Sequence, residues 1–156
     1  SSVFFLILFY QVVNLSPGLI SKKFEQKILR KNADGYLLYK WSNFVLKEKK
    51  NHVIYFHRSI SLAENEAISP NFLHYINPED QGAKIYFDKL KELNPKYALV
   101  YKKSDIEKYK KCFIGLYQKK QNVGFHATRN PLARGNYYDG YIFEIDSKLF
   151  PDCIKK

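Results

Sequence analysis

The stretch Val123–Asp146, VGFHATRNPLARGNYYDGYIFEID, decides how the last third of the chain folds. Its opening residues, Val123–Phe125, form a short apolar run that predicts a strand ending near His126. After a polar loop the chain returns into a second apolar run, Tyr141–Ile145, which predicts a neighbouring strand. Arg129 and Arg134 lie in the loop between them, so this stretch brings basic and titratable side chains to the end of a sheet.

Upstream of this stretch the pattern predicts further antiparallel pairing. Cys112–Tyr117 is another strand-like run, and the polar segment Gln118–Asn122 separates it from the strand that reaches His126 and Thr128. Two such runs joined by a short polar segment are typical of a β-hairpin over about residues 112–128. The strand at 141–145 completes an antiparallel sheet in the last third.

Helix signals dominate the first two thirds, so the expected fold class is α+β. Four segments carry N-terminal capping patterns that predict helix starts: Ser16-Pro17, Ser61–Glu64, Asn77–Asp80 and Ser104–Glu107. Tyr36–Leu46 fits a helix and a strand equally well, and the sequence leaves this choice open.

The totals indicate a single compact basic domain. The chain has 156 residues and a formal net charge of +11, and this charge comes mainly from lysine. Lysine in excess attracts polyanions such as RNA. A lysine-biased proteome would produce the same composition. The first thirteen residues are apolar almost throughout; they are too short to span a bilayer as a helix, which leaves a buried element or a targeting remnant.

Cysteine and methionine usage restricts the compartment and the chemistry. Cys112 and Cys153 are the only cysteines, which is too few for a zinc site built on cysteine alone. They form a disulfide if the protein is exported and remain thiols otherwise. The absence of methionine indicates a processed or excised chain. No metal-ligand spacing and no glycine-rich phosphate loop occurs, so neither a metal nor a cofactor is predicted.

Histidine and arginine carry the functional hypothesis. His57 and His126 each end a predicted strand, and Arg58 and Arg129 lie beside them. If the two imidazoles meet, one takes the proton of the ribose 2′-hydroxyl and the other protonates the leaving oxygen, which cleaves RNA without a metal. Arginine and lysine would hold the phosphates, from the positions Arg58, Arg129, Arg134 and Lys111. In the simpler interpretation the histidines cap sheet edges and the arginines form ordinary salt bridges.

Three segments of this region, Phe113–Gly115, Gly124–His126 and Tyr138–Tyr141, follow one another in a familiar pattern. They resemble part of the EndoU endoribonucleases, and the resemblance implies a catalytic role for His126. Tyr138 and Tyr141 are predicted as aromatic contacts of the substrate. Lys111 stands where that family has its first histidine, and Ala127-Thr128 replaces an Asn-Trp pair, so only His126 carries over.

Three other segments, Val53–His57, Gly82–Phe87 and Tyr141–Asp146, follow one another along the chain. Their order is similar to that of the strands and site residues of ADP-ribosyltransferase toxins. This likeness implies that His57 holds the nicotinamide ribose of NAD, that Tyr86 stacks on the nicotinamide and that Glu144 orients a ribose hydroxyl. The favoured interpretation remains a basic domain that binds RNA or another phosphate-rich partner and cleaves RNA. The transferase is one alternative, and a non-catalytic subunit of an RNA–protein particle or a secreted binding protein is the other.

Overall fold

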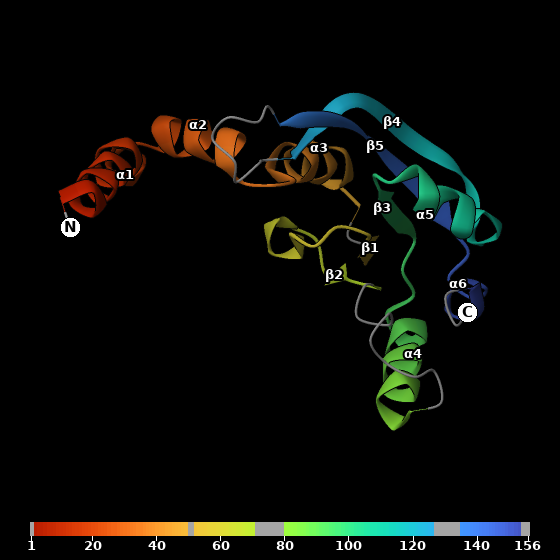
Figure 1. The fold of residues 1–156 in the computed structure, drawn as a ribbon. Coiled ribbons are helices and arrows are strands. Elements are labelled where there is room, and N and C mark those ends of the chain that lie inside the picture. The colour runs from red at the N-terminus through yellow and green to blue at the C-terminus, as the bar shows by residue number, and fades with distance from the viewer. Residues whose placement is uncertain (1, 50–51, 71–79, 127–134, 154–156) are drawn as a thin grey trace.

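The computed structural model describes residues 2–49, 52–70, 80–126 and 135–153 (Figure 1). The helices of these ranges are α1 Ser2–Ile20, α2 Lys22–Asn32, α3 Tyr36–Leu46, α4 Gln81–Leu93, α5 Lys103–Lys108 and α6 Phe150–Cys153, with 3₁₀ turns η1 Ile60–Leu62 and η3 Lys110–Cys112. The strands are β1 Val53–Tyr55, β2 Ala67–Ile68, β3 Tyr97–Val100, β4 Phe113–His126 and β5 Asn136–Ile145.

The strands form one mixed sheet in the order β2-β1-β3-β5-β4. β1 pairs in parallel with both β2 and β3, whereas β5 pairs antiparallel with β3 and with β4. The predicted α+β class is confirmed, and the last third is antiparallel as expected. The parallel half of the sheet comes from strands in the middle of the chain.

Alternating side chains give the sheet two buried faces. Val53 and Leu99 point to the face that α3 covers, where Leu38 lies in the same cluster. Ile54 and Ala98 point to the opposite face and pack in a cluster that includes residues of α4 and α6. Helices on both faces explain why β1 and β3 are apolar at every position, since a strand covered on both sides exposes neither set of side chains.

The region predicted as a hairpin is a single long strand. β4 runs without a turn from Phe113 to His126, and its antiparallel partner is β5. The polar segment remains part of the strand, because the pairing with β5 shifts register between Lys120 and Gly124. Asn122, within this shift, has a positive φ of 50°. The carboxylate of Asp139 accepts the Asn122 N–H at 3.0 Å. This bond stabilises a bulge where the sequence suggested a turn.

Other local predictions had mixed outcomes. Tyr36–Leu46 is a helix, and the helix predicted near Ser104 is present as α5. The helix predicted from Ser61 is absent, because the chain there forms η1 and then joins the sheet edge as β2. α4 follows Asp80 as expected, whereas the predicted capping residues 77–79 lie outside the described residues.

The N-terminal helix departs most from expectation. α1 continues through the predicted helix start at Ser16-Pro17, and the break falls at Ser21, whose backbone is extended. Every side chain from Val3 to Phe9 is between 45% and 69% exposed, so this part is not the buried element that the sequence suggested. Figure 1 shows α1 beyond α2, away from the sheet. None of the helices in the described ranges combines the length and apolar character that crossing a membrane requires.

A disulfide joins Cys112 to Cys153 across 41 residues of sequence. It ties η3, at the entrance to β4, to the short C-terminal helix α6. Of the two cysteine states that the sequence left open, the structure has the bonded one.

Candidate functional site

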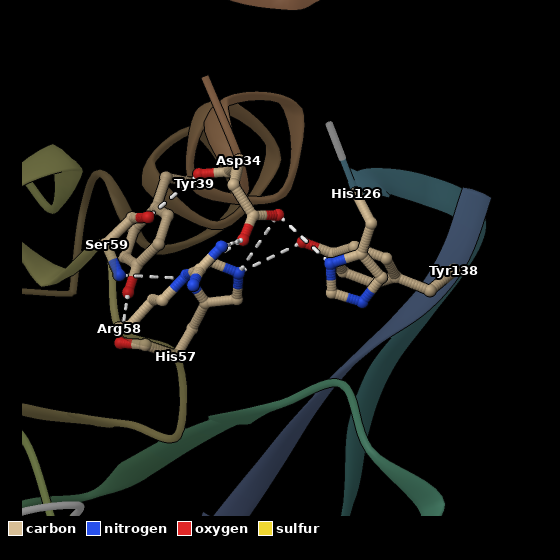
Figure 2. A network of polar contacts seen from close by, with 7 residues as sticks. All are labelled: Asp34, Tyr39, His57, Arg58, Ser59, His126 and Tyr138. Carbon is tan, nitrogen blue, oxygen red and sulfur yellow. Dashed lines mark hydrogen bonds and ion pairs between the residues drawn. The ribbon is translucent and has the colours of Figure 1, made fainter. Parts of the chain in front are cut away.

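A network of polar side chains centres on Asp34, in the turn between α2 and α3 (Figure 2). Gly35, the residue before α3, has a φ of +79°, a conformation that glycine adopts at no steric cost. The Ser59 hydroxyl donates to the Asp34 carbonyl at 2.8 Å, which fixes the turn to the segment after β1. The Asp34 carboxylate therefore projects toward the ends of β1 and β4.

His57 is the buried member of this network. Its side chain is 1% exposed, and its Nδ1 accepts the backbone N–H of Ser59 at 3.1 Å. A backbone N–H can only donate, so the neutral imidazole must carry its proton on Nε2. That nitrogen lies 3.1 Å from the Tyr138 hydroxyl and 3.9 Å from Asp34 Oδ1.

His126 is the exposed member. It is the last residue of β4, its side chain is 46% exposed, and its Nδ1 lies 3.1 Å from Asp34 Oδ1 although the two residues are 92 positions apart. An ionised carboxylate only accepts hydrogen bonds, so Nδ1–H donates to it. In a neutral imidazole this arrangement leaves the lone pair on Nε2, the nitrogen turned away from Asp34.

Arg58 holds the carboxylate from the other side. Its Nε and Nη2 donate to Asp34 Oδ2 at 3.0 and 2.6 Å. Burial raises the pKa of the Asp34 carboxyl. The hydrogen bond from Arg58, the attraction of the His57 ring when it is protonated and the hydrogen bond from His126 more than offset this effect, so the pKa lies below its usual value. Asp34 is therefore ionised at neutral pH and orients the His126 ring.

Burial has the opposite consequence for His57. Its pKa falls to about 4, mainly because the interior penalises the charged imidazolium. The attraction of Asp34 opposes this, whereas repulsion from the imidazolium form of His126 and from the cations Arg58 and Lys102 adds to it. His57 is therefore neutral at physiological pH. Because its side chain is closed to solvent, His57 cannot contact a substrate, and the acid–base role that the sequence suggested for it is not supported by its position.

Two tyrosine rings pack against the histidines of the network. Tyr101 follows β3, and its ring centroid lies 4.9 Å from that of His57 and 5.7 Å from that of His126. The Tyr138 ring lies 4.3 Å from the His126 ring. It also lies across Gly124 on the adjacent strand, where an added Cβ would come within 1.9 Å of Tyr138 Cε2. Glycine at this position is what allows the tyrosine to reach the histidines.

The structure brings together four of the side chains predicted from the sequence: His57, Arg58, His126 and Tyr138. Arg58, predicted to hold phosphate, is engaged with Asp34 through two nitrogens, although its side chain is 76% exposed. Arg129 and Arg134 lie outside the described residues.

The remaining predicted residues lie elsewhere. Lys111 is an exposed residue of η3 beside the disulfide, and the Tyr86 hydroxyl donates to the Ser69 carbonyl at 3.1 Å. Tyr141 donates to Asp139, and Lys119 lies over its ring. Glu144 pairs with Tyr97 at the far end of β3.

The transferase interpretation needs His57, Tyr86 and Glu144 in one cleft. Glu144 lies six positions along β5 from Tyr138, which touches His57, and a strand rises about 3.3 Å per residue. The carboxylate is thus roughly 20 Å along the strand from the histidines. Tyr86 packs against the sheet face that carries α4, and the contacts described for His57 come from other residues.

Three members of the site were missed from the sequence: Asp34, Ser59 and Tyr101. The patterns around these residues indicated local structure and no function. The available signal for Asp34 was the Asp-Gly pair, which places a carboxylate on a left-handed turn. No sequence pattern links that turn to a histidine 92 positions later.

The described surface is hollowed beside α3. One hollow of about 420 Å³ includes Tyr36, Lys40 and Phe44, and another of about 390 Å³ includes Arg30, Lys40 and Lys120. Neither is lined by Asp34 or by a histidine. Within the described residues, no group of three or more His, Cys, Asp or Glu side chains is placed to hold a metal ion.

Residues 30–156 match the model of the DUF1420 C-terminal domain family, and the chain belongs to that family. The matched region contains every residue of the Asp34 network, whereas α1 and all but the last turn of α2 precede it. No curated protein and no solved structure matches the chain.

Proposed function

We propose that this domain binds RNA and cleaves it by acid–base catalysis, with His126 as the general base. The observation that carries the proposal is the pair formed by Asp34 and His126. An exposed imidazole receives support at Nδ1 from an ionised, largely buried carboxylate that Arg58 holds in place. Such support fixes the ring tautomer and directs the basic nitrogen outward, which is how histidine serves as a general base in many hydrolases.

The chemistry follows from this geometry. His126 Nε2 takes the proton of a ribose 2′-hydroxyl, and the 2′-oxygen attacks the adjacent phosphorus. The bond to the 5′-oxygen breaks, and the products are a 2′,3′-cyclic phosphate and a free 5′-hydroxyl. RNA supplies its own nucleophile in this reaction, so a single base and a single acid are sufficient.

Tyr138 is the candidate for the acid. Burial and the charge of Asp34 raise the pKa of its phenol, so the hydroxyl remains protonated. The His57 Nε2–H donates to the phenolic oxygen and leaves the hydroxyl proton free to point at the leaving 5′-oxygen. His57 therefore acts as a positioning residue behind Tyr138. A proton passed through water from the His126 imidazolium then restores the phenol.

Cations around the pair favour a phosphate substrate. Arg58 is exposed beyond its contacts with Asp34, and the Lys102 ammonium lies over the Tyr101 ring, 5.5 Å from its centroid. Both are placed next to the histidines, where they stabilise the charge that develops on a phosphorane. The net charge of +11 supports long-range attraction of RNA.

The test is incubation of the full chain with labelled single-stranded RNA in excess chelator. We expect cleavage to a 2′,3′-cyclic phosphate, no cleavage of the same oligonucleotide with 2′-deoxy residues, and a loss of about 10² to 10⁴ in rate for His126→Gln. Glu144→Gln is the control, because Glu144 lies outside the network, and it should retain the wild-type rate. Retained cleavage in His126→Gln, or no cleavage by the wild type, rejects the proposal. Nicotinamide release from NAD that depends on Glu144 would support the transferase instead.

A further inference from the structure

The N-terminal helix leaves an unusual amount of apolar surface uncovered. All side chains from Val3 to Phe9 are large and apolar, and they are exposed around the whole circumference of α1. Val12 is 62% exposed on the next turn. A helix that is apolar all round is normally buried in protein or in lipid. The described parts of this chain do not bury it, and an apolar medium such as the acyl chains of a lipid surface would.

Cationic side chains begin where the apolar helix ends. Ser21 breaks the helix, and α2 then presents exposed basic residues, namely Lys22, Lys23, Lys27 and Arg30. Ile28 and Leu29 are half-buried, which directs this basic surface outward. Phe24 lies among the cations and is 49% exposed.

We propose that α1 and α2 dock the domain on an anionic lipid surface, with α1 among the acyl chains and α2 along the headgroups. Two features favour lipid over a protein partner. A partner helix would cover only one apolar stripe of α1, whereas the whole circumference of α1 is apolar. A cluster of lysine and arginine directly beside an apolar helix matches anionic headgroups, which attract such segments electrostatically.

The arrangement leaves the Asp34 network free. α1 lies away from the sheet, beyond α2 (Figure 1). Asp34 follows the other end of α2, and His126 contacts it there. Docking into a lipid surface does not require a helix to cross the bilayer. The proposal does not rest on RNA cleavage, and it requires only that α1 and α2 face the same membrane.

The first test is co-sedimentation of the full chain with vesicles of phosphatidylcholine alone or with about 30% phosphatidylserine. We expect strong binding to the anionic vesicles that weakens with added salt. Changing Lys22, Lys23 and Lys27 together to Gln should lower the partition coefficient by roughly tenfold or more. A matched triple change at Lys89, Lys91 and Lys148 removes the same charge elsewhere and should have a much smaller effect. Equal losses in the two triple variants, or no binding at low salt, would overturn the proposal.

The second test reports on insertion. The tryptophan introduced by Phe5→Trp is expected to shift its emission to shorter wavelength with anionic vesicles and to be quenched by lipids brominated on the acyl chains. The wild type, whose buried Trp41 emits alone, gives the background to subtract. An unquenched signal from the introduced indole would place α1 outside the lipid and overturn the proposal.

Light scattering without vesicles tests the alternative that a second copy of the chain, and not lipid, packs on α1. A second copy of the chain packed on this helix gives a dimer that Leu6→Asn with Phe9→Asn dissociates. That result also overturns the proposal, whereas a monomer at low protein concentration agrees with it.

Discussion

His57 lies directly against Gly35, and an added Cβ at Gly35 would come within 2.4 Å of His57 Cε1. The glycine combines this close approach with a φ of +79°. The turn that carries Asp34 can therefore approach the end of β1 only because this position has no side chain. The contact joins the helical first part of the domain to the sheet, and it sets the position of the carboxylate that both histidines share.

Gly35→Ala should lower the free energy of unfolding by more than about 1 to 2 kcal/mol, since the left-handed backbone alone costs that much for an L-residue and the contact with His57 adds to it. Urea denaturation measures the change. Gly82→Ala is the matched control: Gly82 lies in α4, its added Cβ has nothing within 4 Å, and alanine favours a helix. We expect Gly82→Ala to be neutral or stabilising, and a similar loss in both variants would contradict the assigned contact.

Acid should destabilise the domain through His57. The pKa of this imidazole is about 4 in the folded protein against 6.5 for an ordinary histidine, so between these values the unfolded chain binds a proton that the native protein does not. The contribution is fully present above pH 6.5 and is lost as the pH falls toward 4, by about 3 kcal/mol in total.

Unfolding free energies measured from about pH 7 to pH 4 check this expectation. His57→Asn should be less stable at neutral pH but should show a shallower decline with acid. His52→Gln, which changes a partly exposed histidine paired with Glu66, should keep the wild-type decline. An unchanged slope in His57→Asn would show that the acid sensitivity arises elsewhere.

Gly124→Ala should displace the Tyr138 ring, because the new Cβ would overlap it. We expect RNA cleavage to slow by about 10- to 100-fold, a range typical of a catalytic group misplaced by about 1 Å. Gly115→Ala on the same strand meets nothing within 4 Å and should leave the rate unchanged. Circular dichroism and the unfolding midpoint of both variants separate a local displacement from a loss of fold.

The disulfide should stabilise the domain by about 2 to 4 kcal/mol, the range expected for closing a chain segment of this length. The comparison is urea unfolding of the oxidised protein, the reduced protein and Cys112→Ser with Cys153→Ser. Reduction should lower the midpoint of the wild type and leave the double variant unaffected. Equal midpoints for oxidised and reduced wild type would contradict this role.

The sequence predicted the parts of the fold that depend on local pattern. The strands β1 and β5 and the helix α4 follow from apolar spacing and from capping residues. The prediction of a hairpin was wrong. Asp139, on the partner strand, accepts the Asn122 N–H, and this bond allows β4 to continue through a polar segment. That hydrogen bond comes from a residue 17 positions away and has no local signal.

The same distinction applies to the site. His57 and His126 could be singled out because each was predicted to end a strand beside an arginine. His126 is the last residue of β4, His57 follows β1 by two residues, and both strands belong to one sheet. Their unequal burial could not be predicted, since it depends on how α3 and the Tyr138 ring cover His57. Asp34 joins them through a tertiary contact, so the residue at the centre of the network is the one that the sequence did not indicate.

The central claim is that Asp34 and His126 act as one catalytic unit on RNA. Its most direct test is a double-mutant cycle: single-turnover RNA cleavage in chelator by the wild type, Asp34→Asn, His126→Gln and the double variant. Groups that act as a unit are non-additive, so we predict that the double variant is no slower than His126→Gln alone. Independent, additive losses from the two substitutions, or a wild type that does not cleave RNA, would contradict the claim.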